Sequence, residues 1–120
     1  MLRAKFPRPQ RLRGRSNFAL FAKAKHYYGA IIRAAVVIKE GRKAAFVVSK
    51  KVSPSAVDRN RLKRRLRELY RKCNNLLPPN SWIMFIALPV AAYADFTALQ
   101  EDFNILCQKI ASRISGSVSN

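Results

Sequence analysis

The chain has 120 residues, of which 24 are lysine or arginine and 6 are acidic, so its formal net charge is +18. A charge excess of this size opposes compaction through self-repulsion, and it favours a polyanion, most often nucleic acid, as the partner. A membrane surface is the alternative, but no stretch approaches the roughly 18–20 apolar residues of a spanning helix, and the cations are not confined to one amphipathic helix.

The length fits a single domain, and 49% apolar residues are enough to form a core. Residues 1–15 contain six cations and two prolines, which predicts a basic and extended N-terminal arm. Residues 16–114 are expected to form the folded domain, and residues 115–120 a polar tail.

The first half of the domain is expected to contain a short helix and two strands. Ser16 is a plausible N-cap for the helix, and the aromatic residues at 26–28 are interpreted as a loop or the start of a strand. Residues 30–39 and 44–52 are rich in β-branched and small apolar residues, which predicts two strands joined by a hairpin-type turn at Glu40–Lys43.

The next predicted helix spans residues 56–73 and is capped by either Ser53 or Ser55. At about 100° per residue, its apolar side chains share one face and most of its polar and cationic side chains point the other way. The predicted apolar face carries Leu62, Leu66, Leu69, Tyr70 and Cys73, and the opposite face carries Asn60, Arg64, Arg67 and Arg71. A merely solvated face is the simpler interpretation, but it does not require this density of arginine, whose planar group binds phosphate in a bidentate way.

The last third of the chain predicts a buried strand and a long helix. Trp82–Leu88 is a nearly continuous apolar run, as expected for an interior strand covered on both faces, and Pro89 ends it. Asp95 is expected to cap a final helix whose apolar residues recur every three or four positions. The element order therefore predicts an α+β fold, with one sheet of three or four strands and helices mainly on one face.

The sequence predicts no catalytic or metal site in the protein itself. The six acids do not form a credible pair, and Glu101 and Asp102 are expected on the exposed part of the last helix. Cys73 and Cys107 fall on apolar helix faces, which predicts buried free thiols instead of a disulfide, in a reducing compartment. With one histidine and no Cys/His cluster, a zinc site is excluded.

Two segments together resemble the signature of the bacterial ribonuclease P protein subunit. They are Val48–Val52 and Ala56–Glu68, above all the Arg59–Arg61 triplet and the cations after it. The Arg11–Arg13 lead-in, the apolar strand and the closing helix agree with the same family, so the resemblance covers roughly residues 11–113.

The resemblance implies more than spacing alone can show. It implies the fold of the second domain of ribosomal protein S5, with the basic helix in a left-handed crossover between parallel strands, against the usual hand. It also implies a cytoplasmic, non-catalytic subunit that binds a catalytic RNA, which cleaves the 5′ leader from precursor tRNA with magnesium. No cofactor of the protein itself, no small-molecule substrate and no membrane partner are implied.

The resemblance also assigns residues to two binding sites. The catalytic RNA would be contacted by Lys50, Lys51, Arg59, Asn60, Arg61, Lys63, Arg64 and Arg67. The single-stranded leader would lie in a cleft lined by Phe18, Phe21, Phe46, Val48 and Ser49. Two departures predict weaker or differently built leader stacking here: the first-helix phenylalanines are three residues apart instead of four, and Ile31–Lys39 lacks an aromatic residue.

Two other classes of protein fit the composition. A small ribosomal protein that binds ribosomal RNA has a similar size, charge and element pattern. A sequence-specific DNA-binding module could use residues 56–73 as a recognition helix, but arginines greatly outnumber the polar residues that read bases.

Overall fold

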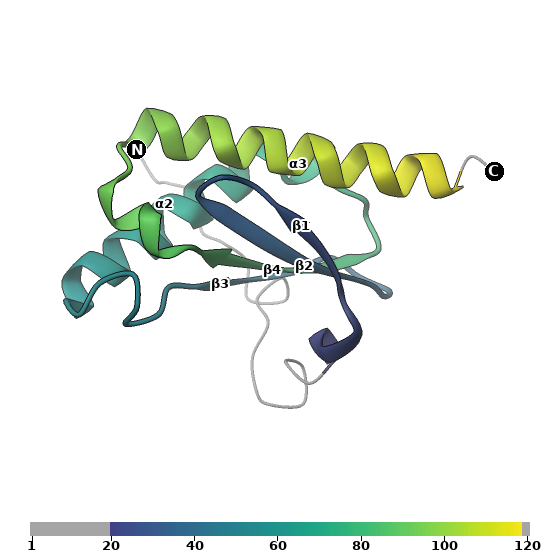
Figure 1. Ribbon diagram of the computed structural model, residues 1–120. Coiled ribbons are helices and arrows are strands. Elements are labelled where there is room, and N and C mark those ends of the chain that lie inside the picture. The colour runs from purple at the N-terminus through teal and green to yellow at the C-terminus, as the bar shows by residue number, and fades with distance from the viewer. Residues whose placement is uncertain (1–19, 119–120) are drawn as a thin grey trace, which may run out of the picture.

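The computed structural model describes residues 20–118, which form one four-stranded sheet with two α-helices on the same face (Figure 1). The predicted α+β fold is confirmed. The strands are β1 (Lys25–Tyr28), β2 (Ile32–Ile38), β3 (Lys43–Val47) and β4 (Ser81–Ala87). The α-helices are α2 (Ala56–Cys73) and α3 (Phe96–Val118), and the 3₁₀ helices are η2 (Leu20–Lys23), η3 (Asn74–Leu76) and η4 (Pro89–Tyr93). The predicted basic arm, the start of the first helix and Phe18 lie outside the described residues.

The strand order is β1-β2-β4-β3, and β4 is the interior strand that its apolar sequence predicts. It pairs antiparallel with β2, where Ala34 lies opposite Phe85, and parallel with β3, where Phe46 lies opposite the same Phe85. The basic helix α2 therefore connects two parallel strands, as the resemblance implied. The left hand of this crossover stays a prediction.

The predicted strands are wrong in two details and incomplete in a third. Glu40–Lys43 does not close a hairpin, because β4 lies between β2 and β3; an apolar strand buried on both faces needs a partner at each edge. The strand predicted at 44–52 ends at Val47, and a turn follows it, with the Val52 amide donating to the Ser49 carbonyl at 3.0 Å. Residues 25–28, where a loop or the start of a strand was expected, form a separate strand, β1.

Side chains alternate between two cores on the two faces of the sheet. The larger core joins α2 and α3 to the sheet around Phe85, whose ring centre lies 4.8 Å from that of Phe103 and 5.9 Å from that of Tyr70. The smaller core lies on the other face, where Phe21 packs in a cluster that includes Trp82.

Both α-helices are capped at their N-terminal ends by local side chains. Ser55, and not Ser53, caps α2, because its Oγ accepts the amide N–H of Asp58 at 3.3 Å. Asp95 caps α3 as predicted, and its Oδ1 accepts the Ala98 amide at 2.8 Å. Helix α3 continues to Val118, past the expected start of the polar tail.

The predicted exposure of Asp102 is wrong. Its carboxylate is buried and accepts the amide N–H groups of Ala30, Ile31 and Ile32 at 2.8, 3.0 and 2.9 Å. Residue 102 follows Leu99 by three positions and therefore lies on the sheet-facing side of α3, where the bend before β2 supplies donors that no helical pattern reveals.

Both cysteines are free thiols, as predicted. Cys107 is buried, and Cys73 is half-buried and donates to Asn104 Oδ1 at 3.3 Å. Within residues 20–118, no helix is both long and apolar enough to cross a membrane.

Candidate nucleic-acid interface

The outward face of α2 is a continuous polar and cationic surface. Leu66, Leu69 and Tyr70 are buried against the sheet and α3, so the opposite side of the helix faces solvent, as its periodicity predicts. We call this side the helix surface. Its members are Asn60, Arg61, Arg64 and Arg67, which are exposed, and Lys63, which is half-buried.

The remaining predicted RNA contacts lie at the start of α2. Lys50 and Lys51 are exposed in the turn before the helix, next to the helix surface in sequence. Arg59 is half-buried, and its Nη1 donates to the Ser53 carbonyl at 2.9 Å. Arg59 therefore holds the turn against the helix, in addition to any contact with a ligand.

Positive charge is concentrated in the first part of α2. Near its end, Glu68 forms an ion pair with Arg71 at 3.5 Å, and this pair reduces the positive field there. Asp58 is the one other acid in the helix. It lies in the first turn, where its negative charge interacts favourably with the positive end of the helix dipole.

Of the five residues predicted to line a leader cleft, Phe18 lies outside the described residues, and the other four are not on one face of the sheet. Phe21 is buried on the face opposite the helices, whereas Phe46 packs on the helix side, with its ring centre 5.7 Å from that of Phe85. Val48 is buried on the helix side, and Ser49 is exposed in the turn after β3. The cause is the alternation of β3, since Ala45 faces Phe21 while its neighbour Phe46 must face the other way.

Among the described residues, the face of the sheet opposite α2 and α3 carries aromatic and basic side chains that the sequence did not assign to a binding site. His26 and Tyr28 are exposed on β1, and their rings stack with centres 6.3 Å apart and planes at 28°. Arg33 Nη1 lies 3.4 Å from His26 Nδ1. The missing signal was β1 itself, because two tyrosines before a glycine favour a strand.

The same face carries a second pair of basic side chains, from Lys39 after β2 and Lys43 at the start of β3. The ammonium groups of Lys39 and Lys43 lie 5.0 and 4.6 Å from the ring centre of Trp82, whose Nε1 donates to the Glu40 carbonyl. We call this face the sheet surface; it comprises His26, Tyr28, Arg33, Lys39 and Lys43, and the buried Trp82 supports the two lysines. The sheet itself separates this surface from the helix surface.

The described residues offer no obvious catalytic group. No cluster of three or more His, Cys, Asp or Glu residues within 20–118 could hold a metal ion. Burial raises the pKa of Cys107, and likewise that of Tyr70, to about 12, so both groups are protonated at neutral pH and are poor nucleophiles.

Comparisons with known proteins agree on one family. A family model described as Ribonuclease P matches residues 6–111. Two relatives are both named ribonuclease P protein component. One, from Pseudanabaena, is 35% identical over 107 residues, covering 85% of this chain and 92% of the relative. The other, from Streptomyces avermitilis, is 47% identical over 68 residues; this match covers 57% of this chain and only 54% of the Streptomyces protein.

Solved structures give the same fold. The RNase P protein of Thermotoga maritima superposes with a TM-score of 0.74 at 24% identity, covering 83% of this chain and 96% of that one. The protein from Staphylococcus aureus gives a TM-score of 0.73 at 20% identity, covering 90% and 94%. With its family signature on the exposed side of a crossover helix and a family match across most of its length, this chain belongs to the ribonuclease P protein family.

Proposed function

We propose that this chain is the protein subunit of ribonuclease P and promotes the magnesium-dependent removal of the 5′ leader from precursor tRNA. The observation that carries the proposal is the helix surface, where the residues of the family signature project together from α2 into solvent. The catalytic RNA would bind there, and the leader would bind at the sheet surface.

Binding of the catalytic RNA would be mainly electrostatic. Arg61 and Arg64 are exposed and can each hold a phosphate in a bidentate way. Cations of this kind replace the counterions of the RNA, so affinity falls with salt in proportion to the number of phosphates contacted. The bound protein would reduce phosphate repulsion within the folded RNA and its complex with substrate.

Leader binding would use stacking and charge together. Tyr28 and His26 present ring faces on which unpaired bases can stack, and Arg33 lies beside them. Lys39 and Lys43 extend the positive charge across the same face. This arrangement replaces the single cleft with Phe21 and Phe46 that the sequence predicted.

Catalysis would belong to the RNA. We assign magnesium to the ribonucleoprotein as a whole; within residues 20–118, no group of three or more His, Cys, Asp or Glu residues could hold a metal ion. The proposed location is the cytoplasm, since two free thiols suit a reducing compartment. We propose neither a membrane partner nor a small-molecule substrate.

A ribosomal protein remains the rival class, and the family match favours ribonuclease P over it. Co-purifying RNA separates the two: one abundant RNA of a few hundred nucleotides supports our proposal, and ribosomal RNA contradicts it.

The direct test is cleavage of precursor tRNA by a bacterial ribonuclease P RNA, with and without the protein, across magnesium concentrations. The protein should lower the magnesium requirement. Replacing Arg61 and Arg64 together with alanine should weaken RNA binding for every leader sequence and reduce the slope of log affinity against log salt by about 2. Lys72→Ala is the matched control, because Lys72 is exposed on the same helix but outside the signature. Unchanged processing at low magnesium by the double variant would show that the helix surface lacks this role.

A further inference from the structure

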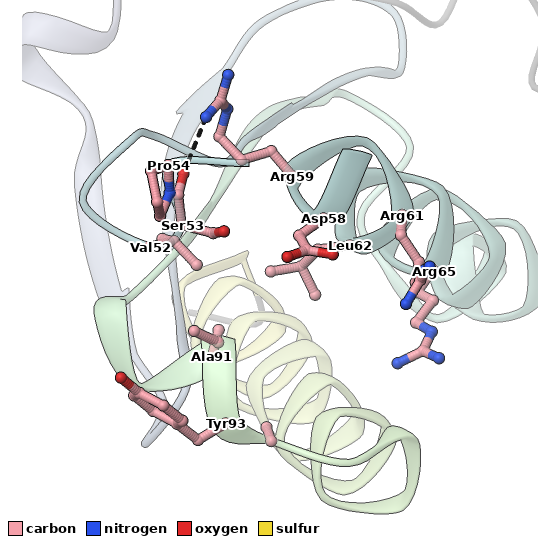
Figure 2. A pocket seen from close by; sticks show the side chains of 12 residues that line it. Val52, Ser53, Pro54, Asp58, Arg59, Arg61, Leu62, Arg65, Ala91 and Tyr93 are labelled. Carbon is pink, nitrogen blue, oxygen red and sulfur yellow. Dashed lines mark hydrogen bonds between the residues drawn. The ribbon is translucent and has the colours of Figure 1, made fainter. Parts of the chain in front are cut away.

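A pocket of about 360 Å³ opens at the beginning of α2, between the preceding turn, the first turns of the helix and η4 (Figure 2). Arg61 and Arg65 lie at one side of it and Tyr93 at the other (Figure 2). This volume falls in the range of sites that bind small organic groups.

Tyr93 is the most exposed large hydrophobic side chain among the described residues, with 90% of its surface accessible. Singly exposed aromatics are common and indicate nothing by themselves. This one lies at the end of η4, on the side of the pocket opposite Arg61 and Arg65, and its ring is exposed to solvent, where a base can stack on it (Figure 2).

The charges around the pocket are unevenly placed. Arg65 is half-buried, and its guanidinium lies 5.9 Å from the centre of the Phe96 ring, which restricts its orientation. Arg59 also lines the pocket, but its guanidinium points away, towards the Ser53 carbonyl (Figure 2). Arg61 and Arg65 therefore supply the charge at the opening.

We propose that this pocket binds one unstacked nucleotide of a folded RNA, with its base on Tyr93 and its phosphate on Arg61 and Arg65. The proposal rests on the proposed function, because it extends the RNA interface from α2 to η4. Arg61 belongs to both the pocket and the helix surface, so one RNA strand can contact the two without a break.

The chemistry of the lining suits a nucleotide better than a bare anion. RNA is recognised chiefly at loops and bulges, where unpaired bases stack on aromatic rings or guanidinium planes. Leu62 and Ala91 provide apolar surface beneath such a base. Asp58 lines the pocket as well, and its carboxylate disfavours a phosphate nearby but can accept a hydrogen bond from a ribose hydroxyl.

The test separates stacking from charge by measuring affinity for a full-length bacterial ribonuclease P RNA at several salt concentrations. Tyr93→Ala should weaken binding about 5- to 150-fold, the usual range for one stacked base, without changing the salt slope. Tyr93→Phe should stay within about twofold, because the ring face is kept. Arg65→Ala should weaken binding and reduce the slope by about 1.

Val90→Ala is the matched control, because Val90 is exposed on the same short helix and does not line the pocket. Loss of affinity in Tyr93→Ala no greater than in Val90→Ala would overturn the inference, as would a reduced salt slope in Tyr93→Ala. A melting temperature matching wild type excludes a folding defect as the cause.

Failure of this inference is distinguishable from failure of the proposed function. If wild type binds the RNA and Arg64→Ala weakens binding while Tyr93→Ala does not, only the nucleotide pocket is refuted. If wild type does not bind the RNA, the proposed function is refuted as well. Binding of an acidic peptide that Tyr93→Ala abolishes, with RNA affinity unchanged, would reassign the pocket to a protein partner.

Discussion

Asp102 links helix α3 by hydrogen bonds to the bend before strand β2, and its removal should destabilise the fold. The carboxylate accepts three backbone N–H groups, and the Asp102→Ala variant leaves all three without this partner. Ile32 is fully buried, so its N–H loses its partner without gaining water. Ala30 is exposed and Ile31 is half-buried, so water can partly replace their bonds.

The expected loss follows from these three environments. An unsatisfied buried donor costs about 1–3 kcal/mol, and loss of each of the two more exposed hydrogen bonds, from Ala30 and Ile31, adds about 1 kcal/mol. The free energy of unfolding of Asp102→Ala should therefore be lower than that of wild type by about 3–5 kcal/mol. For a domain of this size that corresponds to a fall in melting temperature of roughly 10–20 °C. Asp102→Asn should lose about half as much, because one oxygen still accepts while the amide group faces a donor.

Urea unfolding followed by circular dichroism measures this loss. Glu101→Ala is the matched control: it removes the same charge from the adjacent, exposed position of α3 and should change stability by less than about 0.5 kcal/mol. An Asp102→Ala variant within about 1 kcal/mol of that control would refute the reasoning. Gly29 gives an independent check, because a Cβ there would lie 2.5 Å from Asp102 Oδ2. Gly29→Ala should therefore cost less in the Asp102→Ala background than in wild type.

Three further outcomes are expected. Tyr28→Ala should weaken binding of precursor tRNA with a single-stranded leader about 5- to 150-fold and leave binding of leaderless tRNA unchanged. Ile38→Ala, at another exposed position, is the control and should change the affinity for neither RNA. An equal loss of affinity for both RNAs in Tyr28→Ala would contradict leader stacking at the sheet surface. Because burial raises the pKa of Cys107 from 9.0 to about 12, the folded state favours the protonated thiol. Stability should therefore be full below about pH 9 and decline between pH 9 and 12. Cys107→Ala should make unfolding curves less dependent on pH in that window, and Tyr70 and Cys73, whose pKa values burial also raises, should contribute to the dependence that remains. Ser55→Ala should cost about 1 kcal/mol in the same unfolding assay, and no loss would show that its cap contributes nothing.

The sequence predicted those features whose causes are local. Helix α2 spans the predicted residues 56–73, because the three- and four-residue spacing of its leucines fixes which side is buried. The interior position of β4 follows from its unbroken apolar run, and the start of α3 follows from Asp95. Composition predicts a polyanionic partner, because no neutral ligand compensates a charge of +18.

Tertiary structure decided everything that depends on which elements meet. An apolar strand does not specify its neighbours, so only the fold shows that β4 separates β2 from β3. The packing of η2 against β2 places Phe21 on the face opposite to Phe46, and the pairing of β1 with β2 brings Tyr28 to the face of Phe21. The partners of Asp102 and the pocket between α2 and η4 arise from segments far apart in the chain. Periodicity encodes which face of an element is buried, whereas the identity of the element that covers it is a long-range property of packing.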